Sequence, residues 1–213
     1  MSDASELLRE KEGDERHARA LAEVEAHDIV AREMRHRLKN LLAIVASLAR
    51  LTGRQAERTA DFLPIFSRRV SDLAAAQHLL TEYPDQRAHL PHLIESLLGG
   101  EDRDERIRFG DIPPVRLDEH SARVVALVLG ELFTNAQKYG ALSRDGGHIT
   151  LTVTVNDGRI DLMWSETCEG PIAKPKRTGS GTVLMRRMTA REPQPLDIEW
   201  RDTGIVARLS VRA

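Results

Sequence analysis

The chain of 213 residues carries 31 basic and 33 acidic residues, and its formal net charge of −2 gives no electrostatic support for binding nucleic acid. With 41% hydrophobic residues it can bury the core of one or two domains. Its single cysteine, Cys168, excludes an internal disulfide, and no apolar run approaches the roughly 18–20 residues that cross a membrane. We therefore expect a cytoplasmic protein that binds neither nucleic acid nor a membrane.

The first part of the chain is predicted to be mostly helical. Residues 1–30 are rich in charged residues and alanine, which indicates a charged helical lead-in rather than a separate domain. Residues 31–84 hold two amphipathic helices, the second broken near its start by Pro64, and these predict a helical hairpin. A hairpin alone leaves apolar faces uncovered, so we expect a homodimer in which two hairpins form a four-helix bundle.

Residues 85–213 mix helices with short strands and form the second predicted domain. Helices are predicted over 90–98, 118–142 and 182–192. Two alternating apolar segments, 148–155 and 159–165, flank Asn156-Asp157-Gly158, which is a hairpin signal. A second hairpin is predicted around Thr203-Gly204. Helices combined with largely antiparallel strands indicate an α+β domain.

The long helix predicted over 118–142 carries three polar residues at i, i+4 and i+7, namely Glu131, Asn135 and Lys138, which therefore share one face. That face could simply be solvated. It would also suit a nucleoside triphosphate with Mg²⁺, because an amide oxygen ligates hard cations and a lysine neutralises phosphate. The carboxylate could orient a water or an attacking group. Spacing alone leaves both interpretations open.

Two further segments carry weaker signals. Residues 178–182, TGSGT, open the last predicted helix, where glycines let backbone N–H groups approach a phosphate. Two glycines before a helix are more often a simple turn. Residues 35–40, RHRLKN, place His36 four residues before Asn40 at the edge of an apolar stripe. Without other information, His36 is most simply a surface histidine.

Taken in order, these segments resemble the HWE/HisKA_2 class of bacterial sensor histidine kinases, within the GHKL ATPase superfamily. The resemblance covers about residues 28–213. It rests on a phosphoacceptor-like segment at 34–50, an N-box-like segment at 131–143, the tryptophan-x-glutamate signature at 164–166, and a glycine box at 178–182. It implies a helical-hairpin dimerisation and phosphoacceptor region followed by a GHKL-type α/β sandwich that binds ATP and Mg²⁺.

The resemblance also assigns roles to individual residues. His36 would be the phosphoacceptor, Glu33 would orient its ring, and Asn40 would position a water against a receiver's aspartyl phosphate. In the ATP site, Glu131 would activate or orient the reacting groups. The remaining contacts with the nucleotide and metal would come from Asn135 (Mg²⁺), Lys138 (phosphate), Glu166 (adenine amino group), and Gly179, Gly181 and Thr182 in the glycine box.

Two positions depart from the family pattern. Gly130 stands where the N box usually has a histidine, and Thr167-Cys168-Glu169-Gly170 alters the glycine pair expected after the tryptophan-x-glutamate signature. A mid-helix glycine costs about 1 kcal/mol relative to alanine. These changes concern the catalytic rate and ATP affinity more than the fold.

The sequence therefore predicts a protein-histidine kinase that autophosphorylates His36 and transfers the phosphoryl group to the receiver domain of a response regulator in two-component signalling. One alternative is a histidine phosphotransferase or receiver phosphatase with a degenerate ATP site. Another is a non-enzymatic receiver-binding module. Because only residues 1–30 precede the hairpin, we expect input from an upstream sensor protein or through the N-terminal helix.

Overall fold

The computed structural model describes residues 28, 31–32, 34–36, 38–54, 56, 59–82, 87–99, 105–170, 172 and 179–213. The chain divides into two compact units, Met1–Ser47 and Leu48–Ala213. The boundary between these units lies within the predicted hairpin region. The predicted division into 1–30, 31–84 and 85–213 stays a prediction. The lead-in at 1–27, Glu33 and the loop at 173–178 lie outside the described residues.

In the first unit, the described residues from 28 to 47 are all helical, as predicted. Three large apolar side chains at four-residue spacing, Met34, Leu38 and Leu42, are exposed to solvent by 67%, 57% and 59%. Because residues four apart share a helix face, they form one apolar stripe.

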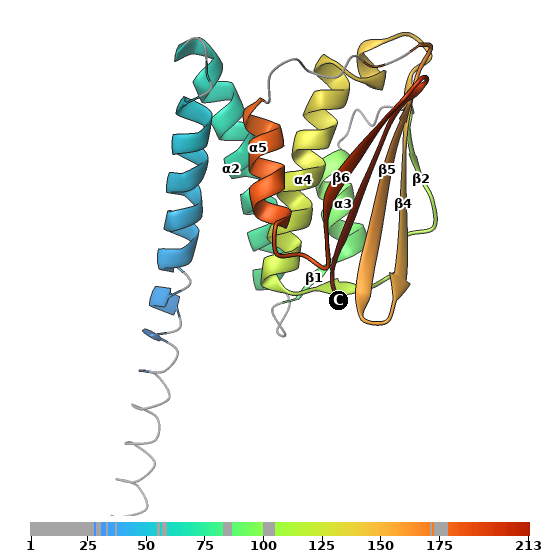
Figure 1. Ribbon diagram of the computed structural model, residues 1–213. Helices are drawn as coiled ribbons and strands as arrows, with labels where there is room; N and C mark the ends of the chain where they lie inside the picture. The colour runs from blue at the N-terminus through green and yellow to red at the C-terminus, as the bar shows by residue number, and fades with distance from the viewer. Residues whose placement is uncertain are drawn as a thin grey trace, which may run out of the picture. The chain divides into compact units, whose positions relative to one another are not determined.

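In the second unit, helix α2 (Thr59–Glu82) forms the outermost layer against α4 (Glu119–Lys138) (Figure 1). Leu73, Ala76 and Leu80 are buried along it. The predicted break at Pro64 is wrong, because α2 runs through this residue. Pro64 is the sixth residue of α2, so it removes one hydrogen bond, to the carbonyl of Ala60, and the helix continues through it.

A five-stranded sheet has the strand order β2-β4-β5-β7-β6. Its strands are β2 (Ile107–Phe109), β4 (His148–Asn156), β5 (Arg159–Thr167), β6 (Gln194–Arg201) and β7 (Gly204–Arg212). All neighbouring pairs are antiparallel except β2 with β4. A separate pair joins β1 (Ala88–His89) to β3 (Arg116–Leu117). The predicted hairpin between β4 and β5 is confirmed, since Asp157 and Gly158 have φ angles of 48° and 72°.

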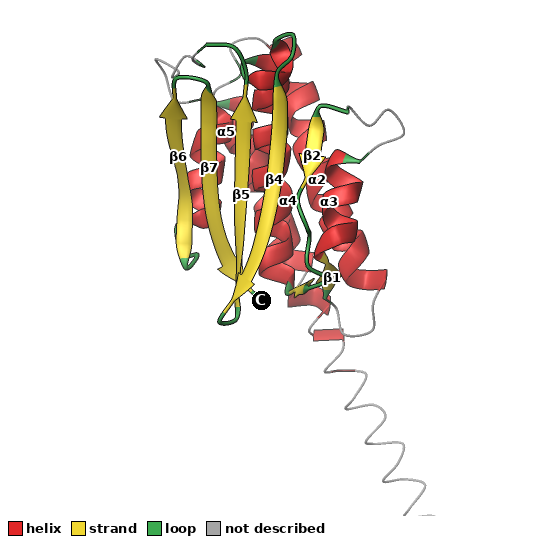
Figure 2. Cartoon of the chain, turned by 90° about the vertical axis from the view of Figure 1, so that its right-hand side faces the viewer, coloured by secondary structure: helices red, strands yellow, loops and turns green. Residues whose placement is uncertain are grey.

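The helices α3 (Leu90–Leu98), α4 and α5 (Ser180–Thr189) lie on one face of this sheet (Figure 2). Side chains alternate across a strand, so Ile160, Leu162, Trp164 and Glu166 of β5 all point to the buried side. Central α4 is apolar on nearly all sides because it packs against the sheet, α2, α3 and α5. This architecture confirms the predicted α+β class. Within the described residues, no helix is both long and apolar enough to span a membrane.

Candidate nucleotide-binding and phosphoacceptor sites

Helix α4 positions the first group of predicted site residues. Asp118 caps its N-terminus by accepting a hydrogen bond from the backbone N–H of Ser121 at 2.7 Å. The predicted face then runs from Glu131, buried, through Asn135, half-buried, to Lys138, exposed. At 1.5 Å of rise per residue, these side chains extend over about 10 Å of the helix. Solvent exposure therefore increases along this face, from a closed end at Glu131 to an open end at Lys138.

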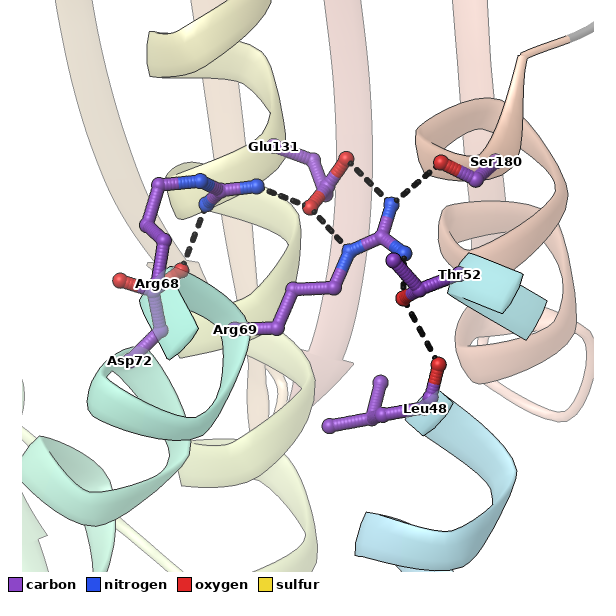
Figure 3. Close-up of polar contacts among 7 residues, drawn as sticks. All are labelled: Leu48, Thr52, Arg68, Arg69, Asp72, Glu131 and Ser180. Carbon is purple, nitrogen blue, oxygen red and sulfur yellow. Dashed lines mark hydrogen bonds and ion pairs between the residues drawn. The ribbon is translucent and has the colours of Figure 1, made fainter. Parts of the chain in front are cut away.

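At the closed end, Glu131 accepts hydrogen bonds from two arginines of α2 (Figure 3). Arg69 binds it in a bidentate manner, with Nε 2.8 Å from Oε1 and Nη2 3.1 Å from Oε2. Arg68 Nη2 donates to the same Oε1. Burial by itself would raise the pKa of Glu131, but the Arg69 hydrogen bond and the positive charge of Arg68 outweigh it and lower the pKa below its usual value. Glu131 is thus a paired, ionised carboxylate.

The glycine box meets Glu131 from α5. Gly181 is buried, and a Cβ built on it would lie 2.1 Å from Oε2 of Glu131, so a larger residue would displace this carboxylate. Ser180 Oγ accepts a hydrogen bond from Arg69 Nη2 at 2.9 Å. Gly179 differs, because its φ is −72° and its Cβ would meet no atom within 4 Å. Thr182 is half-buried in the first turn of α5.

The open end of α4 lies against Glu166 of β5. Ala141 N donates to Oε2 of Glu166 at 2.8 Å, and the indole of Trp164 donates to Oε1 at 3.1 Å. A Cβ on Gly140 would lie 2.0 Å from Oε2. Burial raises the pKa of Glu166 despite these two donors. Each carboxylate oxygen keeps a second lone pair, so Glu166 can still accept from an exocyclic amine.

Between these two ends lies a donor set that suits a hard cation and phosphate. The side chain of Asn135 makes no hydrogen bond within the described part of the chain, which leaves its amide oxygen available to a metal ion. Lys138 is exposed and lies in the last turn of α4. Among the described residues, no group of three or more His, Cys, Asp or Glu side chains could hold a metal by itself. A divalent cation here would therefore take most of its ligands from water and from the phosphates of a nucleotide.

The predicted phosphoacceptor lies in the first unit. His36 is exposed, and its Nδ1 lies 3.3 Å from Nδ2 of Asn40. If Asn40 donates an N–H to Nδ1, the neutral ring carries its proton on Nε2. If the amide oxygen faces Nδ1–H instead, Nε2 keeps a free lone pair. The orientation of Asn40 therefore decides which ring nitrogen is nucleophilic. The predicted orienting role of Glu33 concerns a residue outside the described ones.

Three residues of the site were not predicted from the sequence: Arg68, Arg69 and Gly140. Arg69 is only 1% exposed although it is charged. A signal for it exists, because Arg69 falls between Phe66 and Leu73 on the apolar face of α2, where a charge requires a buried partner. The identity of that partner, 62 residues away, has no local signature.

This fold is that of histidine kinase domains of known structure. The histidine kinase domain of a blue-light activated histidine kinase from Erythrobacter litoralis superposes with a TM-score of 0.55, over 80% of this chain and 94% of that one, at 15% identity. A longer structure of that kinase gives a TM-score of 0.62, over 84% and 57%, at 20% identity. At such identities the likeness concerns the fold alone, and it confirms the predicted fold of a histidine kinase catalytic domain.

Sequence comparison relates the chain to named histidine kinases. Residues 33–110 match the model of the HWE histidine kinase family. "Blue-light-activated histidine kinase 1" of Erythrobacter litoralis is 32% identical over 192 residues, which is 85% of this chain and 52% of the relative. "Blue-light-activated histidine kinase" of Brucella ovis is 28% identical over 185 residues, 84% of this chain and 38% of the relative. The chain thus spans about half the length of one relative and less of the other.

Proposed function

We propose that this chain is an ATP-dependent protein-histidine kinase that phosphorylates its own His36 and passes the phosphoryl group to an aspartate of a response-regulator receiver domain. The observation that carries the proposal is the site along α4. There Glu131 meets the glycine box at one end, and the end beyond Lys138 meets Glu166. The match of residues 33–110 to the HWE histidine kinase family supports the same reaction.

In this proposal, the purine of ATP lies at the Glu166 end and its amino group donates to that carboxylate. Asn135 would hold Mg²⁺, which neutralises charge on the phosphates, and Lys138 would contact a phosphate oxygen. The backbone at Gly179, Gly181 and Thr182 would approach the phosphates at the N-terminus of α5, where the helix dipole favours negative charge. Glu131 would orient the reacting groups once its carboxylate is available.

The chemical step needs a histidine nitrogen with a free lone pair. That nitrogen of His36 attacks the γ-phosphorus, so an N–P bond forms while the bond to the bridging oxygen breaks and ADP leaves. The receiver's aspartate oxygen then attacks the same phosphorus, and the imidazole is the leaving group. His36 is exposed, as a group that must reach two different partners has to be.

We further propose that the chain acts as a homodimer in the cytoplasm. The exposed stripe of Met34, Leu38 and Leu42 supports this, because it is an apolar surface that a second copy would cover. An upstream sensor protein is the partner proposed to deliver the signal. The relatives are named for activation by blue light, and this property is a candidate for that input.

The proposal is tested by incubating the purified protein with γ-labelled ATP and Mg²⁺. Label that is acid-labile and alkali-stable, and that disappears in His36→Ala and Asn135→Ala, is the expected result. Two exposed residues of the same types, His78 and Asn156, provide matched controls, and their alanine variants should retain the label. Absence of label in folded, ATP-binding protein would contradict the proposal.

One observation favours a second function, that of a receiver phosphatase. Glu131 is held by two arginines, and Gly130 replaces the histidine of the family's N box. Asn40 would then position the water that attacks an aspartyl phosphate. Loss of label from a phosphorylated receiver, faster with wild type than with Asn40→Ala, would distinguish this function from the kinase.

A further inference from the structure

A buried ion-pair network ties α2 to α4 and α5, the two helices of the nucleotide site, and its arginines have no part in the proposed reaction. Arg69 is at its centre (Figure 3). Besides its two bonds to Glu131, it donates from Nη1 to Thr52 Oγ1 at 2.7 Å and from Nη2 to Ser180 Oγ at 2.9 Å. Thr52 in turn donates to the carbonyl oxygen of Leu48 at 2.7 Å. One guanidinium therefore links α2, α4, α5 and the end of the preceding helix.

A second arginine reinforces this link. Arg68 reaches Glu131 through Nη2 and donates from Nη1 to Asp72 Oδ2 at 2.7 Å, so Asp72 fixes its position. These two side chains pass directly over Gly130. A Cβ at that position would lie 2.2 Å from Oδ2 of Asp72 and 3.0 Å from Nη1 of Arg68. The residue that departs from the family pattern is thus the one that lets α2 approach α4 this closely.

The network occupies the carboxylate on which the proposed reaction depends. Glu131 accepts from two donors at Oε1 and from one at Oε2, and a Cβ at Gly181 would lie 2.1 Å from Oε2. Three donors already use most of the acceptor capacity of this carboxylate, and only Oε2 keeps a lone pair that could orient water or an attacking imidazole. The phosphates of a nucleotide would also have to compete with Glu131 for the guanidinium groups of the two arginines.

We propose that Arg68 and Arg69 form an autoinhibitory latch, in which α2 holds Glu131 away from the nucleotide and the kinase becomes active when α2 releases α4. This inference rests on the proposed kinase function. Thr52 offers a route for release, because a shift at the end of the helix that precedes α2 would withdraw one of the partners of Arg69. Gly130 makes the latch possible, and a side chain there would hinder it.

The test compares Arg68→Gln and Gly130→Ala with wild type in two measurements: the initial rate of autophosphorylation, and the affinity for Mg²⁺ with a non-hydrolysable ATP analogue. Both variants leave the Arg69–Glu131 pair in place, so the fold keeps its buried charge compensated. If about one molecule in ten is open, loosening the latch at Arg68 should raise the rate and the affinity, by up to about tenfold. Arg123→Gln is the matched control, since Arg123 pairs with Glu119 at the far end of α4, and it should change neither value.

The outcomes separate the two proposals. Unchanged rate and affinity in both variants would overturn the latch and leave the kinase function standing. Weaker binding of the analogue by Arg68→Gln would also overturn it, since Arg68 would then be a phosphate ligand. If no variant is labelled, the kinase function fails. The affinity measurement still decides whether α2 restricts the nucleotide site, and tighter binding by both variants would support that restriction.

Discussion

Gly140 and Glu166 lie so close together that a Cβ on the glycine would be 2.0 Å from Oε2 of the glutamate and 2.8 Å from Cα of Ala136. The contact joins the end of α4 to the buried face of β5. It also explains why the N–H of Ala141 can reach the same carboxylate oxygen. The position of Glu166 therefore depends on a residue that has no side chain.

From this contact we expect Gly140→Ala to weaken nucleotide binding and to lower the free energy of unfolding by about 1–3 kcal/mol, because the added methyl group must displace Glu166 or the backbone of α4. Calorimetric titration with the ATP analogue and urea unfolding measure the two effects. Gly53→Ala is the control, since its Cβ would meet the ring of Phe62 at an ordinary 3.8 Å. Equal behaviour of the two variants would count against a special role of the Gly140 contact.

The two glycines of the glycine box should respond differently to alanine. Gly181→Ala introduces a methyl group 2.1 Å from Oε2 of Glu131, so it should push that carboxylate out of its arginine pairs and cost about 1–3 kcal/mol of stability. Gly179→Ala adds a methyl group in open space at a φ of −72° and should leave stability within about 0.5 kcal/mol of wild type. Thermal unfolding of both variants, followed by circular dichroism, checks this difference. Similar losses at both positions would show that the close approach to Glu131 is not what requires glycine.

These glycines also show which features of the site could be predicted from the sequence. The glycine box was predicted because glycine allows a phosphate to approach, which is a property of residues 178–182 alone. That Gly181 makes room for Glu131 depends on the packing of α5 against α4, and no local pattern contains this information. Local signals likewise predicted the β4–β5 hairpin and the shared face of Glu131 and Asn135. They did not predict the parallel pairing of β2 with β4, which joins segments about 40 residues apart.

The same distinction applies to α2. Its apolar spacing predicted a helix with a buried side, but the partner was expected to be a hairpin and a second copy. The structure packs α2 on α4 as well, and Arg69 rather than an aliphatic residue makes the central contact. A charged residue on an apolar stripe indicates that a counter-charge lies opposite. The fold alone determines that this counter-charge is Glu131.

The pair of His36 and Asn40 leads to a prediction about catalysis. Asn40→Asp offers only acceptor oxygens, so it should hold the ring proton on Nδ1 and leave Nε2 as the free nucleophile. Asn40→Leu removes the partner altogether. A net hydrogen bond of about 1 kcal/mol corresponds to a change of about fivefold, so the autophosphorylation rate of the Asp variant should exceed that of the Leu variant by about this factor. Lys39→Ala, which alters the exposed neighbour of Asn40, is the control.

Equal autophosphorylation rates of the Asn40→Asp and Asn40→Leu variants would contradict this prediction. The tautomer of His36 would then be set by another group or would not limit the reaction. Nitrogen NMR of the ring in both variants gives an independent reading, because it reports which ring nitrogen carries the proton. The two readouts should change together.

Asp72 should make stability depend on pH. Burial, partly offset by the charge of Arg68, raises the pKa of this carboxyl from 3.8 to about 6. The folded state therefore holds the proton more tightly than the unfolded chain. This contribution to stability is fully present below pH 3.8 and is lost as the pH rises through about 6, at a total cost of ~3 kcal/mol. Asp72→Asn cannot ionise and should escape that cost.

The measurement is urea unfolding of wild type and Asp72→Asn at pH 4.5 and 7.5. We expect the stability of the variant relative to wild type to rise by about 2 kcal/mol between these values, since part of the cost is already present at pH 4.5. Glu166 has a raised pKa as well, and Glu131 a lowered one whose stabilisation is lost only as the pH falls below its usual range. Wild type and Asp72→Asn both contain Glu131 and Glu166, so the contributions of these two residues cancel in the difference between the proteins. A constant difference between variant and wild type at both pH values would mean that Asp72 ionises in the folded state as readily as in the unfolded chain, and that Arg68 fully compensates its burial.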